Sequence, residues 1–343
     1  MKEKVLLGMS GGVDSTVTAL LLQKEGYEIE GVYMIMHTLD ELNKTNIQKA
    51  KKVADFLGIK LHIHNIQKKF KKEIYDYFVN SYKKGLTPNP CVVCNRKIKF
   101  GEMLEFADTL GIAKVATGHY VQIKDGFIYK AKDKNKDQSY FLAEVKKEVL
   151  NRVITPLGTW LKDDVKAYAN KIELLQEFAK QKESSEVCFV PNSYVEVLEK
   201  HFPTQKEGIV KDINGKIVGH HKGYMHYTIG KRRGFFVKGA HEPHYVIDID
   251  AKNNTLIVAP KEKLAKRKIK IENINLFIDK KEFEATIKVR YRTAGVAGKV
   301  TISDNSGIIE LYDDVFGVAK GQFAVFYDDD KLIGGGEIVD VLE

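Results

Sequence analysis

The sequence predicts an α/β fold that passes into β structure: a doubly wound, Rossmann-like domain, then a small β-rich domain and a C-terminal β-barrel. Strand and helix patterns alternate from residue 1 to about 180. Beyond residue 193 the helices thin out, and short strands alternate with Asn and Gly turns. A basic run at residues 261–270 marks a further boundary. We therefore expect domains at residues 1–193, 194–263 and 264–343.

Apolar spacing indicates the elements of the first domain. Strand-length apolar runs occupy residues 4–9, 29–36, 60–66 and 114–118, and helical spacing occupies residues 13–25, 47–57 and 70–78. Asp125-Gly126 predicts a hairpin turn. A nucleotide would bind outside the carboxyl ends of such strands, near Met9, Met34 and Gly118. Met34 is equally typical of a core methionine.

The turn between the first strand and the first helix reads GMSGGVDS, at residues 8–15. Gly11 and Gly12 let the backbone approach an anion, and the first-turn amides of the helix would bind it. Ser10 and Ser15 add hydroxyl donors, while Asp14 could hold Mg²⁺. No Lys follows the second glycine, so the turn is not GxxxxGK[ST]. It resembles the SGGxDS loop of enzymes that split ATP into AMP and pyrophosphate to activate a carbonyl oxygen.

Charge and hydropathy narrow the class of protein. The formal net charge of +9 favours an anionic partner. There is no apolar run of about 18 residues, and residues 1–4 lead into a strand, so we expect a cytoplasmic protein without membrane contact. The three cysteines are Cys91, Cys94 and Cys188. Because their number is odd and the expected compartment is reducing, we do not expect structural disulfides.

Two of these thiols share a proline-framed loop. Cys91 and Cys94 precede a helix expected to start near Asn95, where the dipole, Arg96 and Lys97 should lower the thiol pKa. Zinc is disfavoured, because only Cys188 and scattered histidines remain to complete four ligands. A free Cys188 alone would suggest a small buried side chain. Together with an ATP-activating loop, however, the thiols favour sulfur insertion, in which one thiol carries a persulfide and another releases it.

Three further stretches have open interpretations. The Lys136-Asp137-Gln138 segment precedes a helix start and could cap it or contact phosphate. The stretch 220–233, with Lys231, Arg232 and Arg233, is basic and aromatic, as in RNA binders, or is a solvated loop. Arg290, Tyr291 and Arg292 could face RNA, although a charged strand edge explains them better.

The motifs occur in an order that identifies a family. In sequence they are GMSGGVDS, NPCVVCNRKIKF, ATGHY, KDQSYFL, SSEVCFVPN, YTIGKRRG and GQFAVFY. Over essentially the whole chain this combination resembles the bacterial tRNA-specific 2-thiouridylases, the MnmA family. The resemblance implies 2-thiolation of the wobble uridine in tRNAs for Lys, Glu and Gln.

The resemblance also implies residue roles. Cys188 would carry the persulfide and Cys94 would resolve it; Cys91 is a third catalytic candidate whose role stays open, because some members have Asp there. The implied ATP site comprises Gly8, Met9, Ser10, Gly11, Gly12, Val13, Asp14, Ser15, Met34 and Gly118. The implied tRNA contacts are Asn89, Pro90, Cys91, His119, Lys136, Asp137, Gln138, Arg290, Tyr291 and Gln322.

The expected cofactors are ATP and Mg²⁺. The expected partners are tRNA and a sulfur donor such as a cysteine desulfurase or a sulfur-relay protein. We expect the protein to be a monomer. In a second version of the mechanism, the three cysteines ligate an iron–sulfur cluster that binds sulfide. Two other classes remain: an ATP-dependent amidating ligase using the same loop, and an RNA-binding module with a vestigial nucleotide site.

Overall fold

The computed structural model describes residues 2–179, 187–190, 192–239 and 242–342. Contacts divide the chain into two compact units. The first comprises Met1–Ile74, Cys91–Phe189 and Asp330–Ile333, and the second comprises Tyr75–Pro90, Val190–Asp329 and Gly334–Glu343. The three-domain boundaries expected from the sequence stay a prediction.

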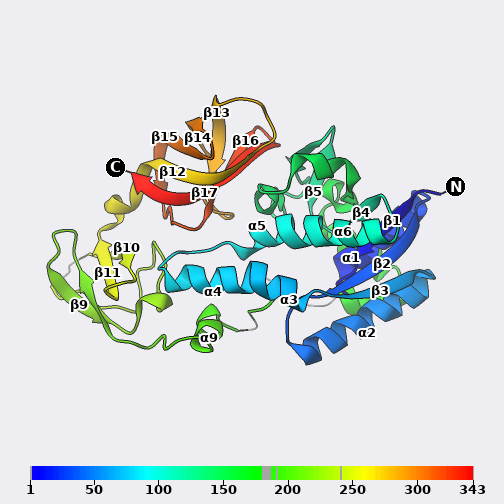
Figure 1. Cartoon of the computed structure of the whole chain (residues 1–343), viewed down its shortest axis with the longest axis horizontal. Helices are drawn as coiled ribbons and strands as arrows, with labels where there is room; N and C mark the ends of the chain where they lie inside the picture. Colours follow the sequence, from blue (N-terminus) through cyan, green and yellow to red (C-terminus); the bar gives the residue numbers. More distant parts are fainter. Residues whose placement is uncertain (1, 180–186, 191, 240–241, 343) are drawn as a thin grey trace. The chain divides into compact units, whose positions relative to one another are not determined.

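A parallel sheet forms the centre of the first unit (Figure 1). Its order is β3-β2-β1-β4-β7, and every neighbouring pair is parallel. The strands are β1 (Lys4–Gly8), β2 (Glu28–Ile35), β3 (Lys60–Asn65), β4 (Lys114–Ala116) and β7 (Val153–Ile154). Val5, Leu6 and Leu7 of the central strand are fully buried, as expected for a sheet covered on both faces. This confirms the Rossmann-like prediction.

Helices cover the sheet on both faces. Val5 and Leu7 belong to one apolar cluster with α1 (Val13–Lys24), α2 (Asp40–Leu57) and α7 (Lys162–Asn170). Gly8 points the other way, because a Cβ there would lie 3.2 Å from the Met103 sulfur of α6 (Met103–Thr109). The carboxyl ends of β1, β2 and β4 are therefore set between two helical layers.

A helical segment runs unbroken from α5 (Pro90–Cys94) through the π-helical η2 (Asn95–Glu102) into α6. The expected helix start near Asn95 was wrong, because the helix begins at Pro90, whose fixed φ suits a first helical position. The other helical segments are α3 (Gln67–Phe70), η1 (Lys71–Tyr75), α4 (Asp76–Lys83), η3 (Ser139–Leu142), η4 (Lys147–Arg152), η5 (Pro156–Thr159), η6 (Glu173–Leu175), α8 (Gln176–Ala179), α9 (Tyr194–Glu199), η7 (Tyr224–His226) and η8 (Lys261–Leu264).

The predicted hairpin at Asp125-Gly126 is confirmed. It joins β5 (Val121–Lys124) to β6 (Phe127–Lys130), and both turn residues have positive φ, of 51° and 71°. Lys331 and Leu332 pair with this hairpin at Tyr129 and Ile128, which is why residues 330–333 belong to the first unit.

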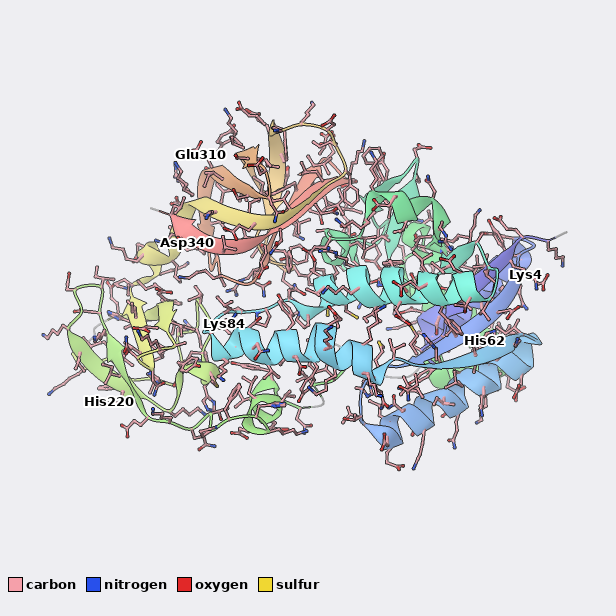
Figure 2. The ribbon with its side chains drawn as sticks, viewed as in Figure 1. Lys4, His62, Lys84, His220, Glu310 and Asp340 are labelled. Atoms are coloured by element: carbon pink, nitrogen blue, oxygen red, sulfur yellow. The ribbon has the colours of Figure 1, made fainter. Side chains whose placement is uncertain are left out.

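Lys4 and His62, labelled in Figure 2, belong to a charge cluster on β1, β2 and β3. His62 Nε2 lies 2.6 Å and Lys4 Nζ 3.7 Å from the Glu30 carboxylate. The hydrogen bond from His62 is the main cause that lowers the pKa of Glu30. These pairs join neighbouring strands and account for the polar residues there without a ligand.

A four-stranded sheet, ordered β10-β11-β8-β9, follows in the second unit. Its strands are β8 (Gly208–Lys211), β9 (Ile217–His221), β10 (Tyr245–Asp250) and β11 (Thr255–Ala259). Val210, Tyr227, Val246, Leu256 and Val258 form its buried core. The predicted small β-rich region is confirmed.

Six antiparallel strands close the C-terminal barrel in the order β12-β15-β14-β13-β16-β17, with β17 returning to β12. They are β12 (Ala265–Leu276), β13 (Glu282–Lys288), β14 (Val296–Ser303), β15 (Ser306–Phe316), β16 (Phe323–Asp328) and β17 (Lys331–Leu342). Ile269, Val300, Ile309 and Phe326 are fully buried. Closure removes the free strand edges and confirms the predicted barrel. No helix within the described residues is long and apolar enough to cross a membrane.

Candidate functional site

The glycine turn ends β1 and begins α1. Thr16 N–H makes the first helical hydrogen bond to Gly12 O, at 3.2 Å, and the Ser15 and Thr16 hydroxyls donate to the same oxygen at 3.0 Å. Gly11 has φ of +77°, and a Cβ there would lie 2.9 Å from Asn46 O. No side chain of the described residues caps α1. A helix start with a glycine turn and no cap is suited to bind an anion.

The other predicted nucleotide residues follow neighbouring strand ends. Met34 is half-buried near the end of β2. Gly118 lies just beyond β4, where a Cβ would be 3.1 Å from two atoms of Asp14, so only glycine fits against the first turn of α1 without displacement. Met9 differs from expectation in one respect: its side chain is buried against Gly31, which leaves its backbone alone to line the turn.

Asp14 has two partners that the sequence analysis missed. The Lys162 ammonium donates to both of its carboxylate oxygens, at 2.6 and 2.7 Å, and the Tyr120 hydroxyl donates to one of them at 2.8 Å. Lys162 is only 6 % exposed and lies in the first turn of α7. Its own amide donates to the Asp133 carboxylate at 2.9 Å, which fixes the start of that helix. Tyr120 stood in the quoted ATGHY motif, but nothing local marked Lys162.

The three thiols form a second part of the site. Cys94 is buried, Cys91 half-buried and Cys188 exposed as a residue, and all are free. The protein around the Cys188 thiol nevertheless raises its pKa to about 11. Burial is the larger cause, and the nearby Cys91 is the second. Burial likewise raises the pKa of Cys94 to about 12 and raises that of Cys91. Ser184, Ser185, Glu186 and Pro191 of the SSEVCFVPN motif lie outside the described residues.

The prediction of lowered thiol pKa values at Cys91 and Cys94 was therefore wrong. Burial favours the neutral thiol and outweighs the helix start. The two cations expected to help are also engaged elsewhere: Arg96 lies 3.6 Å from the Glu144 carboxylate, and Lys97 pairs with Glu73.

Lys99 is the cation that acts on the thiols. Its charge lowers the pKa of Cys91, of Cys94 and of Cys188, in each case against burial. In an α-helix, residues five apart point about 140° away from each other. Within the π-helical η2, whose hydrogen bonds join residues five apart, the wider turn brings Lys99 towards the side of Cys94.

His119 lies next to Lys99. Lys99 Nζ is 3.3 Å from His119 Nε2, and Thr117 Oγ1 is 2.8 Å from Nδ1. An ammonium can only donate, so Nε2 accepts and Nδ1 carries the proton. Burial, followed by the Lys99 charge, lowers the pKa of His119 well below its usual value. A neutral histidine, adjacent in the chain to Gly118, thus links the thiols to the nucleotide edge of the sheet.

Two of the first unit's predicted tRNA contacts have internal roles. The buried Asp137 carboxylate accepts from Ala131 N–H, Ser139 N–H and the Ser139 hydroxyl, at 3.0, 3.2 and 2.8 Å. Gln138 brackets the backbone of Tyr120, accepting from its N–H at 2.9 Å and donating to its carbonyl at 3.0 Å. Their side chains hold the loop in place, while Lys136 is half-exposed.

In the second unit, Gln322 holds the approach to the cysteine loop. Its amide donates to Thr87 O at 3.0 Å and to Pro88 O at 3.3 Å, just before the buried Asn89 and Pro90. Gln322 therefore acts on the backbone of this segment.

Basic residues of the second unit differ in the contacts of their charged groups, although Lys231, Arg232 and Arg233 are all exposed. Arg290 donates to Ile229 O at 3.0 Å, and it lies with Tyr291 in the loop after β13, so the strand-edge interpretation was wrong. Lys231 donates to His226 O at 2.7 Å, and burial lowers its pKa. Arg232 and Arg233 are exposed and are the better candidates for phosphate contact.

No group of three His, Cys, Asp or Glu side chains in the described part of the chain is arranged to hold a metal ion. An iron–sulfur cluster on the three cysteines stays a hypothesis. Asp14 remains as a single carboxylate beside the phosphate turn, which fits a Mg²⁺ ion that is held mainly by a nucleotide.

Family models match the chain in three consecutive parts. These are a tRNA methyl transferase HUP domain over residues 3–192, a tRNA methyl transferase PRC-barrel domain over 195–260 and an aminomethyltransferase beta-barrel domain over 266–338. The tRNA-specific 2-thiouridylase MnmA of a Nitratiruptor species is 52% identical over 339 residues, covering 99% of this chain and 100% of the relative. The protein of the same name from Campylobacter lari is 54% identical over 336 residues, covering 98% and 99%.

Proposed function

This chain belongs to the MnmA family of tRNA-specific 2-thiouridylases, and on that premise we propose that it uses ATP and a persulfide to convert the wobble uridine of tRNAs for Lys, Glu and Gln to 2-thiouridine. The observation that carries the proposal is the link between three thiols and the phosphate turn through Lys99, His119 and Gly118. The family models have methyltransferase names, but an uncapped glycine turn with nearby thiols supports activation and sulfur transfer.

The first step is activation of the uridine. The turn at residues 8–15 and the start of α1 bind the phosphates of ATP, with Gly118 against Asp14 and Met34 near the base. Asp14 would hold Mg²⁺, which supplies charge neutralisation for the leaving pyrophosphate. The uridine 2-oxygen attacks the α-phosphorus and displaces pyrophosphate, so the oxygen becomes part of an adenylate. Reaching that oxygen requires the base to leave its stack, which costs little in a single-stranded loop.

The second step is sulfur transfer. The terminal sulfur of a Cys188 persulfide attacks the activated carbon, and AMP departs with the uridine oxygen. The Cys94 thiolate attacks the Cys188 sulfur, breaking the persulfide bond and forming a Cys94–Cys188 disulfide. The two electrons that convert the persulfide sulfur to the thiocarbonyl come from the two cysteines. A thiol reductant then restores them, and a cysteine desulfurase or sulfur-relay protein reloads Cys188.

Asn89, Pro90 and Cys91 are proposed to meet the target base, with Gln322 holding the backbone just before them. His119, Lys136, Asp137 and Gln138 complete the first unit's side, although the last two would act through the loop they stabilise. Arg290 and Tyr291 are proposed contacts of the barrel. We further propose that the protein acts as a monomer in the cytoplasm.

Replacing Lys99 should weaken thiol reactivity. Lys99→Met removes a charge that favours the thiolates, so we expect the pKa of Cys94 and Cys188 to rise further. The thiolate fraction at a fixed pH then falls, and alkylation by iodoacetamide slows about tenfold at a pH of about 9. Peptide mass spectrometry measures each cysteine separately. Lys99→Arg should retain the alkylation rate. Lys97→Met, which removes the ion pair with Glu73, is the matched control. Equal alkylation rates in Lys99→Met and wild type would contradict this role.

Replacing the exposed arginines should reduce the salt dependence of tRNA binding. A phosphate contact contributes roughly one unit to the slope of log K against log salt concentration, so Arg232→Ala/Arg233→Ala should flatten that slope by roughly two. Filter binding over a salt series measures it. Lys52→Ala, an exposed lysine of α2, is the control. An unchanged slope in the arginine variant would remove both residues from the interface.

The proposed function is tested by anaerobic incubation of the chain with MgATP, a cysteine desulfurase with cysteine as the persulfide donor, a thiol reductant and unmodified tRNA for Glu, followed by nucleoside mass spectrometry and AMP quantification. Thiouridine and AMP together support it. AMP without thiouridine would mean that activation is correct but the acceptor or sulfur source is wrong. The absence of both AMP and thiouridine would contradict the proposal.

A further inference from the structure

In GxxxxGK[ST] loops a lysine directly follows the second glycine and binds phosphate. The phosphate turn of this chain has no Lys after Gly12. A polyphosphate carries several charges, and helix-start amides alone supply only partial ones. A cation near the turn is therefore needed from elsewhere in the fold.

Lys162 is such a cation. It lies 148 positions from Asp14 in sequence, yet its ammonium is within 2.6 and 2.7 Å of both Asp14 oxygens, in the first turn of α1. It also lies 5.5 Å from the centre of the Tyr120 ring. A buried ammonium is costly unless it is paired, and here the pairing group belongs to the phosphate turn itself.

We propose that Lys162 is the phosphate-binding lysine of this ATP site, held by Asp14 when no nucleotide is bound and transferred to the phosphate chain when MgATP binds. The proposal rests on the proposed function, because it assigns a ligand of the same nucleotide site. Asp14 then takes Mg²⁺ as its counter-ion, so that Lys162, phosphate, metal and Asp14 alternate in charge. Tyr120 keeps Asp14 in place during the exchange through its 2.8 Å hydrogen bond.

Several features fix Lys162 for this exchange. Asp133 caps its amide at 2.9 Å, so the backbone at the start of α7 is anchored independently of Asp14. Val165 and Ala169, further along the same helix, are fully buried in the cluster that also contains α1. Only the flexible side chain has to change partner, which requires no movement of the helix.

The test compares ligands that contain the phosphate chain with one that lacks it. Isothermal titration calorimetry measures ATP, pyrophosphate and AMP binding to the full chain with Mg²⁺ present. Lys162→Met should weaken ATP and pyrophosphate binding by at least about tenfold, whereas AMP binding changes less than about threefold, because a charge-assisted hydrogen bond to the leaving phosphates is lost. Lys162→Arg should retain most of the affinity, and Lys171→Met, an exposed lysine at the other end of α7, is the control.

Asp14→Asn should change pyrophosphate affinity in the opposite direction to Lys162→Met, which a purely structural role of Lys162 would not produce. Without Mg²⁺, loss of the competing carboxylate should strengthen pyrophosphate binding, since Lys162 is no longer neutralised. If Lys162→Met fails to fold, Asp14→Asn/Lys162→Met removes both charges together and should bind pyrophosphate more weakly than Asp14→Asn.

The possible outcomes separate the inference from the function it rests on. Equal weakening of ATP and AMP, unchanged affinities in Lys162→Met, or no gain in Asp14→Asn would each overturn the assignment of Lys162. Wild-type protein that binds neither ATP nor pyrophosphate would instead contradict the proposed ATP-dependent function itself.

Discussion

Cys188→Ser is expected to abolish 2-thiouridine formation while the tRNA is still activated. A serine cannot carry a persulfide, so thiouridine should fall on the order of 10³-fold or more. The phosphate turn and Lys162 are untouched, so pyrophosphate release should continue at least to one equivalent per enzyme. Nucleoside mass spectrometry and a pyrophosphate assay on the same reaction measure both quantities.

Cys94→Ser provides the matched comparison. It should also lose thiouridine, but it retains Cys188, so a persulfide should accumulate there after loading with the sulfur donor. Intact-protein mass spectrometry under anaerobic conditions detects the added sulfur. Wild-type thiouridine yield from Cys188→Ser would contradict the proposed role of Cys188. A persulfide on Cys94 in that variant would reverse the two roles.

Asp14→Asn is expected to lower thiolation turnover by about 100-fold or more while tRNA affinity changes little, because Asp14 faces the nucleotide rather than RNA. Asparagine preserves the size of the side chain and can accept from Tyr120, whereas Asp14→Ala would also remove that contact. Single-turnover kinetics with saturating tRNA measures the loss of rate.

The effect of Asp14→Asn on folding needs its own measurement. Replacing Asp14 leaves the buried Lys162 ammonium without its counter-charge, and thermal melting reports the resulting change in stability. Asp14→Asn/Lys162→Met should recover melting temperature without recovering turnover. A comparable loss of tRNA binding in Asp14→Asn would contradict a role restricted to the nucleotide.

Local signals in the sequence predicted much of this site. The phosphate turn could be recognised because its glycines and hydroxyls lie within eight residues, between apolar runs of strand and helix spacing. Glycine turns between alternating strands likewise predicted the barrel. In both cases the residues that determine the structure are neighbours in the chain.

Lys162 and Lys99 could not be found in this way. Lys162 reaches Asp14 only through the packing of α7 on the core, and no local pattern links two positions so far apart. Lys99 stands in the quoted NRKIKF motif, but α-helical spacing would turn it away from Cys94. Apolar periodicity does not reveal a π-helical segment, so the sequence directed attention to Arg96 and Lys97 instead.

The thiol pKa values show the same limit. Sequence proximity to cations suggested stabilised thiolates, whereas the fold buries Cys94 and pairs both neighbouring cations with Glu144 and Glu73. Desolvation depends on how much protein surrounds a group, which is a property of packing.

The most direct test of the account follows the uridine oxygen. Unmodified tRNA for Glu carrying ¹⁸O at the uridine 2-position is incubated anaerobically with the chain, MgATP, a cysteine desulfurase with cysteine as the persulfide donor and a thiol reductant, and both nucleosides and AMP are analysed by mass spectrometry. We predict one ¹⁸O-labelled AMP for each 2-thiouridine formed, because the activated oxygen leaves with the adenylyl group. Formation of 2-thiouridine with unlabelled AMP would contradict adenylation of the uridine by this site.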